Sequence, residues 1–160
     1  MSLWVVDTSP LIFLAKLDRL ELLRGGADEI LVPRAVLGEI QEYRDEARRR
    51  IEEALVWLTV TPVREHQVVE VLLADLDLGE AETIALALET RAERVVMDDL
   101  DGRRFARRVG LTAVGTLGLL LAARLRGELP SLRAEIERLE RGGFRVGESL
   151  RMAVLEAAGE

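Results

Sequence analysis

Short apolar segments with the length of buried strands alternate with helical segments over the first 126 residues, and this alternation limits the possible folds more than any other feature. The strand-like segments are Leu3–Val6, Glu29–Val32, Leu58–Val63, Arg94–Met97 and Leu111–Val114. Strands that are separated by helices pair in parallel through right-handed crossovers. We therefore predict an α/β sandwich with a short parallel sheet flanked by helices.

The remaining segments of the chain have helical character. Helices are expected at Leu11–Leu23 (one helix, or two interrupted near Asp18), Pro33–Tyr43, Asp45–Trp57, Glu65–Leu76, Glu80–Thr90, Asp101–Val109, Gly115–Arg126, Ser131–Arg141 and Gly147–Ala158. Ser9 is expected to cap the first helix, with Pro10 at its first helical position. We predict that residues 1–126 form the core and that residues 127–160 form a helical extension packed on the same domain.

The residue inventory excludes most kinds of catalytic site. The 160-residue chain has no cysteine and a single histidine, His66. Thiolate metal sites, disulfides and cysteine nucleophiles are therefore excluded, and sites built from several histidines nearly so. Chemistry is left to carboxylates, hydroxyls, arginines or a bound ion.

The charge of the chain is acidic overall, with basic residues in clusters. The net charge of −7 argues against a generic basic surface for nucleic acids, although a carboxylate-lined site that binds cations would suit it. Three arginine clusters stand out: Arg44 with Arg48–Arg50, Arg103 and Arg104 with Arg107 and Arg108, and Arg124 with Arg126. Most of them are expected to be solvated helix faces, and each is a candidate for a phosphate contact.

The chain carries no sign of a membrane or export segment. No basic region precedes a long apolar run at its start, and the apolar stretch at Leu117–Ala123 is far too short to span a bilayer. We therefore expect a cytoplasmic protein that makes no membrane contact.

Acidic residues follow two of the predicted strands, where open α/β sheets bind their ligands. Asp7 lies at the end of the first strand, Leu3–Val6, and Asp98 and Asp99 lie at the end of the strand Arg94–Met97. Two adjacent carboxylates at such an edge raise each other's pKa unless a cation offsets their charge. Both positions are therefore candidates for a cation site.

Two further acids belong to helices. Glu80 lies in the first turn of the helix that precedes the strand Arg94–Met97. Glu82, in the same turn, is the alternative candidate for the acidic position of this helix. Glu80 is nearer to the apolar face of that helix, and we prefer it. Glu39 borders the apolar face of the helix that Pro33 opens, where a carboxylate needs a partner or a metal ion.

Such a set of carboxylates matches few reactions. Hard divalent ions such as Mg²⁺ prefer carboxylate and water oxygens and suit phosphate substrates. One or two of these ions can activate a water molecule and stabilise the leaving oxygen in phosphodiester cleavage. Neither histidine nor cysteine is required for this chemistry.

The order and spacing of several motifs resemble those of PIN domains over nearly the whole chain. The motifs are Val5-Val6-Asp7-Thr8-Ser9-Pro10-Leu11, Val36-Leu37-Gly38-Glu39-Ile40, Leu76-Asp77-Leu78-Gly79-Glu80-Ala81-Glu82, Val95-Val96-Met97-Asp98-Asp99 with Arg103 and Ala106, and Gly115-Thr116-Leu117-Gly118-Leu119-Leu120. Gly143-Phe144-Arg145 and the terminal Ala158-Gly159-Glu160 also resemble one prokaryotic subfamily of these domains.

This resemblance implies a PIN-like three-layer sandwich and a VapC-like toxin ribonuclease, dependent on one or two Mg²⁺ or Mn²⁺ ions. It implies a substrate of single-stranded or structured RNA, a cognate antitoxin and a homodimer. Carried over by position, the catalytic, metal-coordinating residues are Asp7, Glu39, Glu80 and Asp98, with Asp99 as a further ligand and Thr8 and Glu82 in support. Many relatives have Asp in place of Glu80, which leaves the metal geometry open.

Three other α/β folds with an acid after the first strand or a nucleotide site do not fit the sequence. A haloacid-dehalogenase phosphatase needs Asp where Ser9 stands, a receiver domain needs a late lysine, and a Rossmann domain needs a glycine-rich first turn. The stronger alternative is a PIN fold that acts as a non-catalytic binding or scaffold protein, which the acidic composition favours. For the apolar helix Leu117–Leu125 and the final helix, an interface with a second copy or an antitoxin and ordinary internal packing both remain open.

Overall fold

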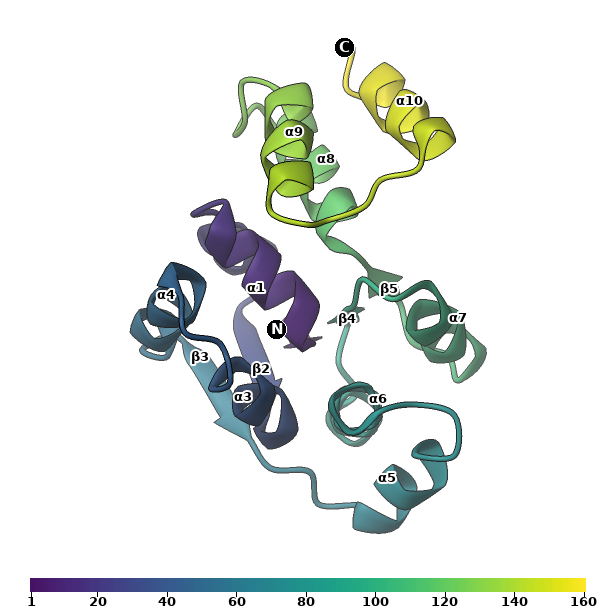
Figure 1. Ribbon diagram of the computed structural model, residues 1–160. Coiled ribbons are helices and arrows are strands. Elements are labelled where there is room, and N and C mark those ends of the chain that lie inside the picture. Colours follow the sequence, from purple (N-terminus) through teal and green to yellow (C-terminus); the bar gives the residue numbers. More distant parts are fainter.

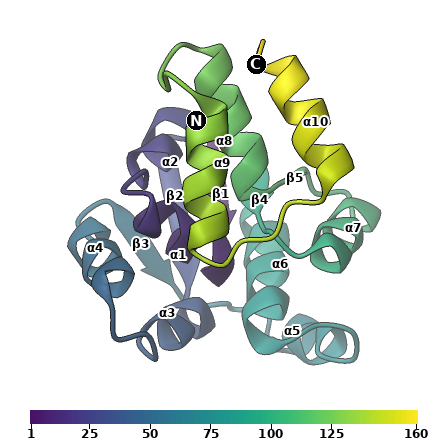
Figure 2. The same cartoon turned by 45° about the horizontal axis from the view of Figure 1, so that its top comes forward.

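A five-stranded parallel sheet lies at the centre of the computed structural model, which describes residues 1–160 (Figures 1 and 2). The strands are β1 (Leu3–Val6), β2 (Glu29–Pro33), β3 (Leu58–Thr61), β4 (Arg94–Val96) and β5 (Ala113–Val114). They are hydrogen-bonded in the order β3-β2-β1-β4-β5, and every neighbouring pair is parallel. The predicted α/β architecture with a short parallel sheet is therefore confirmed.

The side chains of the strands explain why helices cover both faces of the sheet. Trp4 and Val6 of β1 enter one hydrophobic core, and Val5 between them enters the other. Because both faces of a parallel sheet are buried, its strands are continuous apolar runs rather than alternating ones. The helices on the two faces complete a three-layer sandwich.

Ten helices form the outer layers and the C-terminal part. Those with side chains in the larger core are α1 (Thr8–Lys16), α2 (Glu21–Gly26), α3 (Arg34–Ile40), α4 (Glu46–Ala54), α8 (Thr116–Leu125), α9 (Leu132–Arg141) and α10 (Glu148–Ala157). Those in the smaller core are α5 (His66–Leu72), α6 (Leu78–Thr90) and α7 (Leu100–Arg108). None of these helices has both the length and the apolar character needed to cross a membrane.

The first helical region differs from the prediction at its start and agrees with it in the middle. Helix α1 begins at Thr8, so Ser9 lies inside the helix and is not its cap; the Ser9 hydroxyl instead donates to Asp98. The expected interruption is present at Asp18, whose φ is 57°. Aspartate is one of the few residues that tolerate this left-handed conformation, and the chain turns there between α1 and α2.

The C-terminal helices share the core of the strands and of α1. Leu132 and Ile136 of α9 and Leu155 of α10 are buried in the larger cluster. Most of the apolar surface of α8 is also buried within the chain, so internal packing accounts for that helix. Helix α10 keeps Leu150 and Met152 more than half exposed.

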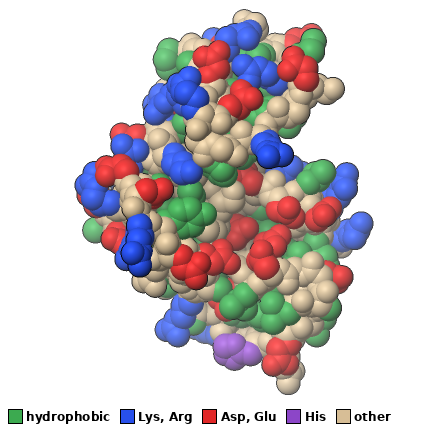
Figure 3. Space-filling view, viewed as in Figure 1, with side chains coloured by type: hydrophobic (Ala, Val, Ile, Leu, Met, Phe, Trp, Pro, Cys, Tyr) green, Lys and Arg blue, Asp and Glu red, His purple; other side chains and the backbone are tan.

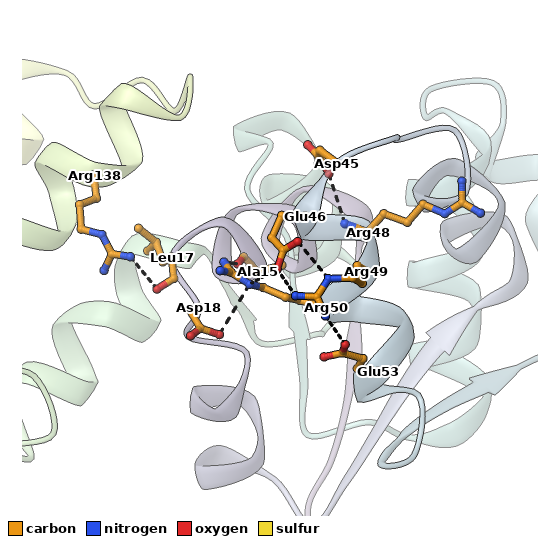
Figure 4. A network of polar contacts seen from close by, with 10 residues as sticks. All are labelled: Ala15, Leu17, Asp18, Asp45, Glu46, Arg48, Arg49, Arg50, Glu53 and Arg138. Atoms are coloured by element: carbon orange, nitrogen blue, oxygen red, sulfur yellow. Dashed lines mark hydrogen bonds and ion pairs between the residues drawn. The ribbon is translucent and has the colours of Figure 1, made fainter.

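The arginines of α4 are bound to their own chain (Figure 4). Arg50 donates to the carbonyl oxygen of Ala15 at 2.7 Å, and Arg49 pairs with Glu46 and Glu53 on its own helix. These contacts fix α4 against the end of α1. They leave Arg49 and Arg50 committed to partners within the protein.

The side chain of Glu160 connects α10 to the start of α9. Its carboxylate accepts hydrogen bonds from the backbone N–H groups of Leu132 (2.7 Å) and Arg133 (3.2 Å) and from the Ser131 hydroxyl (3.0 Å). Burial alone would raise the pKa of Glu160, but these bonds and Arg124 lower it to about 2.

Replacement of Glu160 by glutamine is expected to lower the free energy of unfolding by about 1 kcal/mol at pH 7, the usual contribution of a helix cap. A carboxylate whose pKa is lower in the folded chain stabilises the fold at pH values above its pKa in the unfolded chain, which is 4.5. This stability is lost as the pH falls toward 2, the pKa in the folded chain. The difference between wild type and Glu160→Gln in urea unfolding should therefore shrink over that window. Glu156→Gln, an exposed change on the same helix, should show no such difference.

Candidate functional site

A cavity of about 500 Å³ opens at the carboxyl ends of β1 and β4. The chain passes from β1 outward to β2 and β3, whereas β4 and β5 lie on the other side of β1, so the strand order reverses here. Open α/β sheets bind ligands at such a reversal. The acidic side chains that line the cavity are Asp7, Glu39, Asp77, Glu80, Asp98 and Asp99. Figure 3 shows acidic side chains gathered around a central hollow on this face.

Asp7 is the most buried carboxylate of the cavity, with 7% of its surface exposed. Its backbone N–H donates to the carbonyl oxygen of Val96 at 2.9 Å, which joins the end of β1 to β4. Burial, with a smaller contribution from the nearby carboxylates of Glu39 and Asp98, raises the pKa of Asp7 to about 7. A cation in the cavity would favour the charged form.

Asp98 is held by the start of α8. Its Oδ1 accepts from the backbone N–H of Thr116 and its Oδ2 from the Thr116 hydroxyl, both at 2.7 Å. The Ser9 hydroxyl donates to the same Oδ2 at 3.3 Å. Burial raises the pKa of Asp98, and these hydrogen bonds oppose it. The carboxylate is therefore fixed in orientation before any ligand binds.

Glu39 and Glu80 reach the cavity from two helices. The Thr8 hydroxyl donates to Oε2 of Glu39. Glu80 and Asp77 form a capping box at the start of α6, in which the N–H of Glu80 donates to Oδ1 of Asp77 at 2.8 Å. Burial is the largest cause and the interaction with Asp77 the next, and together they raise the pKa of Glu80 to about 8.

Three glycines make room for three of these carboxylates. None of the three has a positive φ, so they are not required by the backbone conformation. A Cβ atom at each position would instead lie within 3.0 Å of a carboxylate oxygen. The pairs are Gly79 with Oε1 of Glu39 (2.5 Å), Gly102 with Oε2 of Glu80 (2.9 Å) and Gly115 with Oδ1 of Asp98 (3.0 Å).

The two pairs of acids that were ambiguous in the sequence have separate roles. Glu82 does not line the cavity: its Oε1 accepts from the N–H of Ala35 at 3.0 Å and so supports the start of α3, the helix that carries Glu39. Asp99 caps α7 through the N–H of Gly102 at 2.8 Å and lies at the cavity edge. Glu80 is therefore the α6 carboxylate that lines the cavity.

The family model for the PIN domain matches residues 3–160. The chain belongs to the PIN-domain family. Among solved structures, a PilT N-terminus domain protein from the hyperthermophilic archaeon Sulfolobus solfataricus is similar, with a TM-score of 0.55 and 18% sequence identity. The similarity covers 81% of this chain and 95% of that one, and at this identity it shows the fold alone. A search of curated protein sequences found no match.

The wall of this PIN domain opposite the carboxylates is aromatic and basic. Phe13 of α1 and Phe144, in the α9–α10 connection, meet edge to face with their ring centroids 4.9 Å apart. Nζ of Lys16 lies 5.4 Å from the Phe13 ring and donates to the carbonyl oxygen of Gly142 at 3.0 Å. Tyr43 and Arg145 complete this wall. In Figures 1 and 2 the α9–α10 connection crosses the molecule beside α1.

Several residues of the cavity were not predicted as site residues. They are Ser9, Ile12, Phe13, Lys16, Tyr43, Asp77, Gly143, Phe144 and Arg145. Asp77 carried a local signal, because an acid before a helix commonly caps it. Phe144 and Arg145 belong to a motif that the resemblance had marked. Ser9 and Gly143 also lie within motifs of that resemblance, whereas Ile12, Phe13, Lys16 and Tyr43 had no signal in the sequence.

The donor set of this PIN domain fits a hard divalent cation. The cavity supplies carboxylate oxygens and hydroxyls without nitrogen or sulfur ligands, the kind of donors that Mg²⁺ and Mn²⁺ prefer. Without a cation, burial holds the pKa of Asp7, Glu80 and Asp98 above the usual range. No three of these side chains converge as they stand into a group that could hold an ion. A bound ion would therefore draw them together or retain water ligands.

Proposed function

We propose that the protein is a metal-dependent endoribonuclease that hydrolyses phosphodiester bonds of RNA. The observation that carries this proposal is the meeting of Asp7, Glu39, Glu80 and Asp98, from four separate parts of the chain, in one cavity of a nuclease-type fold. Asp7 is buried and the other three carboxylates are partly buried. Carboxylates gathered in this way repel one another, and a cation is the simplest partner that offsets their charge.

In this proposal, Asp7, Glu39, Glu80 and Asp98 hold one or two Mg²⁺ or Mn²⁺ ions, with Asp99 as a further ligand. The chemistry that such an ion would supply at these residues is activation of a water molecule and stabilisation of charge on the leaving oxygen. The chain's own residues orient the carboxylates: the Thr8 hydroxyl binds Glu39, and Ser9 and Thr116 bind Asp98.

The biological setting that we propose is a toxin–antitoxin pair of the VapC-like kind. The protein would then have a cognate antitoxin and form a homodimer, for which the exposed apolar side chains of α10 are the candidate contact. Light scattering over a dilution series tests the dimer: a monomer at every concentration would contradict it.

The cleavage assay compares wild type with Asp7→Asn on a mixed pool of single-stranded RNA, with Mn²⁺, with Mg²⁺ and without metal. We expect metal-dependent cleavage by the wild type and its loss in Asp7→Asn, because the isosteric amide removes a charged ligand. Asp101→Asn is the matched control: it removes the same charge from an exposed position on α7 outside the cavity, and cleavage should persist.

Other outcomes of this assay have definite meanings. Equal cleavage by wild type and Asp7→Asn would show that this cavity is not the site of the activity. Absence of cleavage, together with absence of Mn²⁺ binding to the wild type by calorimetry, would support the alternative of a non-catalytic binding or scaffold protein. Mn²⁺ binding without cleavage of the pool would point to a narrow choice of substrate.

A further inference from the structure

A second cavity, of about 330 Å³, adjoins the carboxylate cavity. The two share Asp98, Phe144 and Arg145, so the α9–α10 connection forms their common border. The lining of the second cavity is different in kind. Arg107 and Arg145 provide positive charge, and Leu117, Leu150 and other side chains of α8 and α10 provide an apolar floor.

Arg145 differs from the other basic side chains of the two cavities because it has no partner within the protein. It makes no hydrogen bond, ion pair or cation–π contact, and it is exposed. Arg107 has one long contact, 3.5 Å to the carbonyl oxygen of Ala113. Arg103, in contrast, donates to the carbonyl oxygen of Asp98 at 2.6 Å. Two guanidinium groups are therefore available to an anion at this border.

A number of arginines elsewhere are instead bound within the protein. The α4 arginines are bound to acids and carbonyl groups of their own chain (Figure 4). Arg138 of α9 pairs with the buried Glu135 and donates to the carbonyl oxygen of Leu17. These groups stabilise the fold and are not free to bind a ligand.

We infer that the second cavity binds the nucleotide next to the scissile phosphate of a single-stranded nucleic acid, with Arg107 and Arg145 on its phosphate groups. This inference rests on the proposed function, which places the scissile phosphate at the carboxylates. A single strand alternates anionic phosphates with apolar base faces, and the cavity offers both a cationic edge and an apolar floor with the Phe144 ring at its border.

An acidic protein segment is the competing occupant. It would match the two arginines but not the apolar floor, and it would extend its negative charge toward Asp98 in the adjoining cavity. A nucleic-acid strand, in contrast, has to continue into the carboxylate cavity if cleavage takes place there. The continuity of the two cavities therefore favours the strand.

The test measures binding rather than cleavage, on an Asp7→Asn background at a fixed Mg²⁺ concentration. Labelled mixed-sequence RNA oligonucleotides of two and six nucleotides are titrated by fluorescence anisotropy at several salt concentrations. The test variant carries Arg107→Gln and Arg145→Gln. The control carries Arg104→Gln and Arg108→Gln, which remove the same charge from the side of α7 that faces a different cavity.

We expect the test variant to bind the hexanucleotide about 10-fold more weakly and to lower the slope of log affinity against log salt by about 1.4, the value for two phosphate contacts on a single strand. Binding of the dinucleotide should change less, because it does not extend across both cavities. The control variant should bind both oligonucleotides as its Asp7→Asn parent does.

Three results would overturn the inference. Equal weakening in the test and control variants would show a diffuse attraction, and absence of binding to the hexanucleotide would show that there is no such subsite. Displacement of the hexanucleotide by a short polyglutamate peptide of higher affinity would assign the cavity to an acidic protein segment. The proposed function is decided separately by metal-dependent cleavage and Mn²⁺ binding: arginine-dependent binding of the oligonucleotide by a protein that neither cleaves RNA nor binds Mn²⁺ would refute that function and keep the nucleic-acid site.

Discussion

Replacement of Gly79 by alanine is expected to reduce metal-dependent cleavage about 100-fold while the protein remains folded. The added Cβ would lie 2.5 Å from Oε1 of Glu39, closer than atoms approach, and the carboxylate at the end of a flexible side chain is the group that moves. A displacement of about 1 Å in a catalytic group costs on the order of 100-fold in rate. Stability should not fall, because alanine favours the helix that Gly79 belongs to.

Gly38→Ala is the matched control for this prediction. Gly38 precedes Glu39 on the exposed side of α3, and nothing lies within 4 Å of a Cβ atom placed there. This change should raise the free energy of unfolding by about 0.5–1 kcal/mol and leave cleavage unchanged. Steady-state cleavage rates of both variants test the predicted activities, and urea unfolding tests the predicted free energies of unfolding. Full activity in Gly79→Ala would show that the position of Glu39 is not critical.

The second large effect concerns Asp7 and the pH, in protein stripped of metal by a chelator. Asp7→Asn is expected to make the protein more stable than wild type at pH 8. Burial raises the pKa of Asp7 from 3.8 to about 7 in the folded chain, so folding holds its proton over this range. The free energy of unfolding of the wild type therefore falls as the pH rises from the pKa of Asp7 in the unfolded chain, 3.8, through its pKa in the folded chain, about 7.

The asparagine variant does not carry this titration, so the two proteins diverge as the pH rises. The difference in unfolding free energy should grow by about 2–3 kcal/mol between pH 5 and pH 8, at 1.36 kcal/mol for each pKa unit. Urea unfolding at several pH values measures it. Asp101→Asn should follow the wild type at every pH. A constant difference between wild type and Asp7→Asn would mean that Asp7 is charged throughout. Added Mn²⁺ should stabilise the wild type and not the variant.

The sheet and the carboxylates were predictable because their signals are local. Apolar runs followed by acids place Asp7 and Asp98 at strand ends, and parallel pairing brings such ends to one edge. The helical face also favoured Glu80 over Glu82, and Glu80 is the one of the two that lines the cavity. The final role of Glu82 was beyond the sequence, because its partner, the N–H of Ala35, comes close only in the folded chain.

The aromatic and basic wall could not be predicted for a related reason. Phe13 appears in the sequence as one more apolar residue of an amphipathic helix, and Phe144 as part of a short loop. Their contact depends on how α9 and α10 pack on α1, which involves side chains distant in sequence. The expected cap at Ser9 was wrong because the helix begins at Thr8, two residues before the expected Pro10, which frees the Ser9 hydroxyl for Asp98.

The position of Phe144 and Arg145 near the end of the chain sets an order in time. All the carboxylates of the cavity precede Gly102 in the sequence, whereas the connection that completes the opposite wall is synthesised more than 40 residues later. At the usual pace of translation this interval is about 2–9 s. A chain on the ribosome therefore carries every acidic group of the cavity for seconds before it acquires Phe144 and Arg145. The lining of the cavity is complete only when the α9–α10 connection packs against α1.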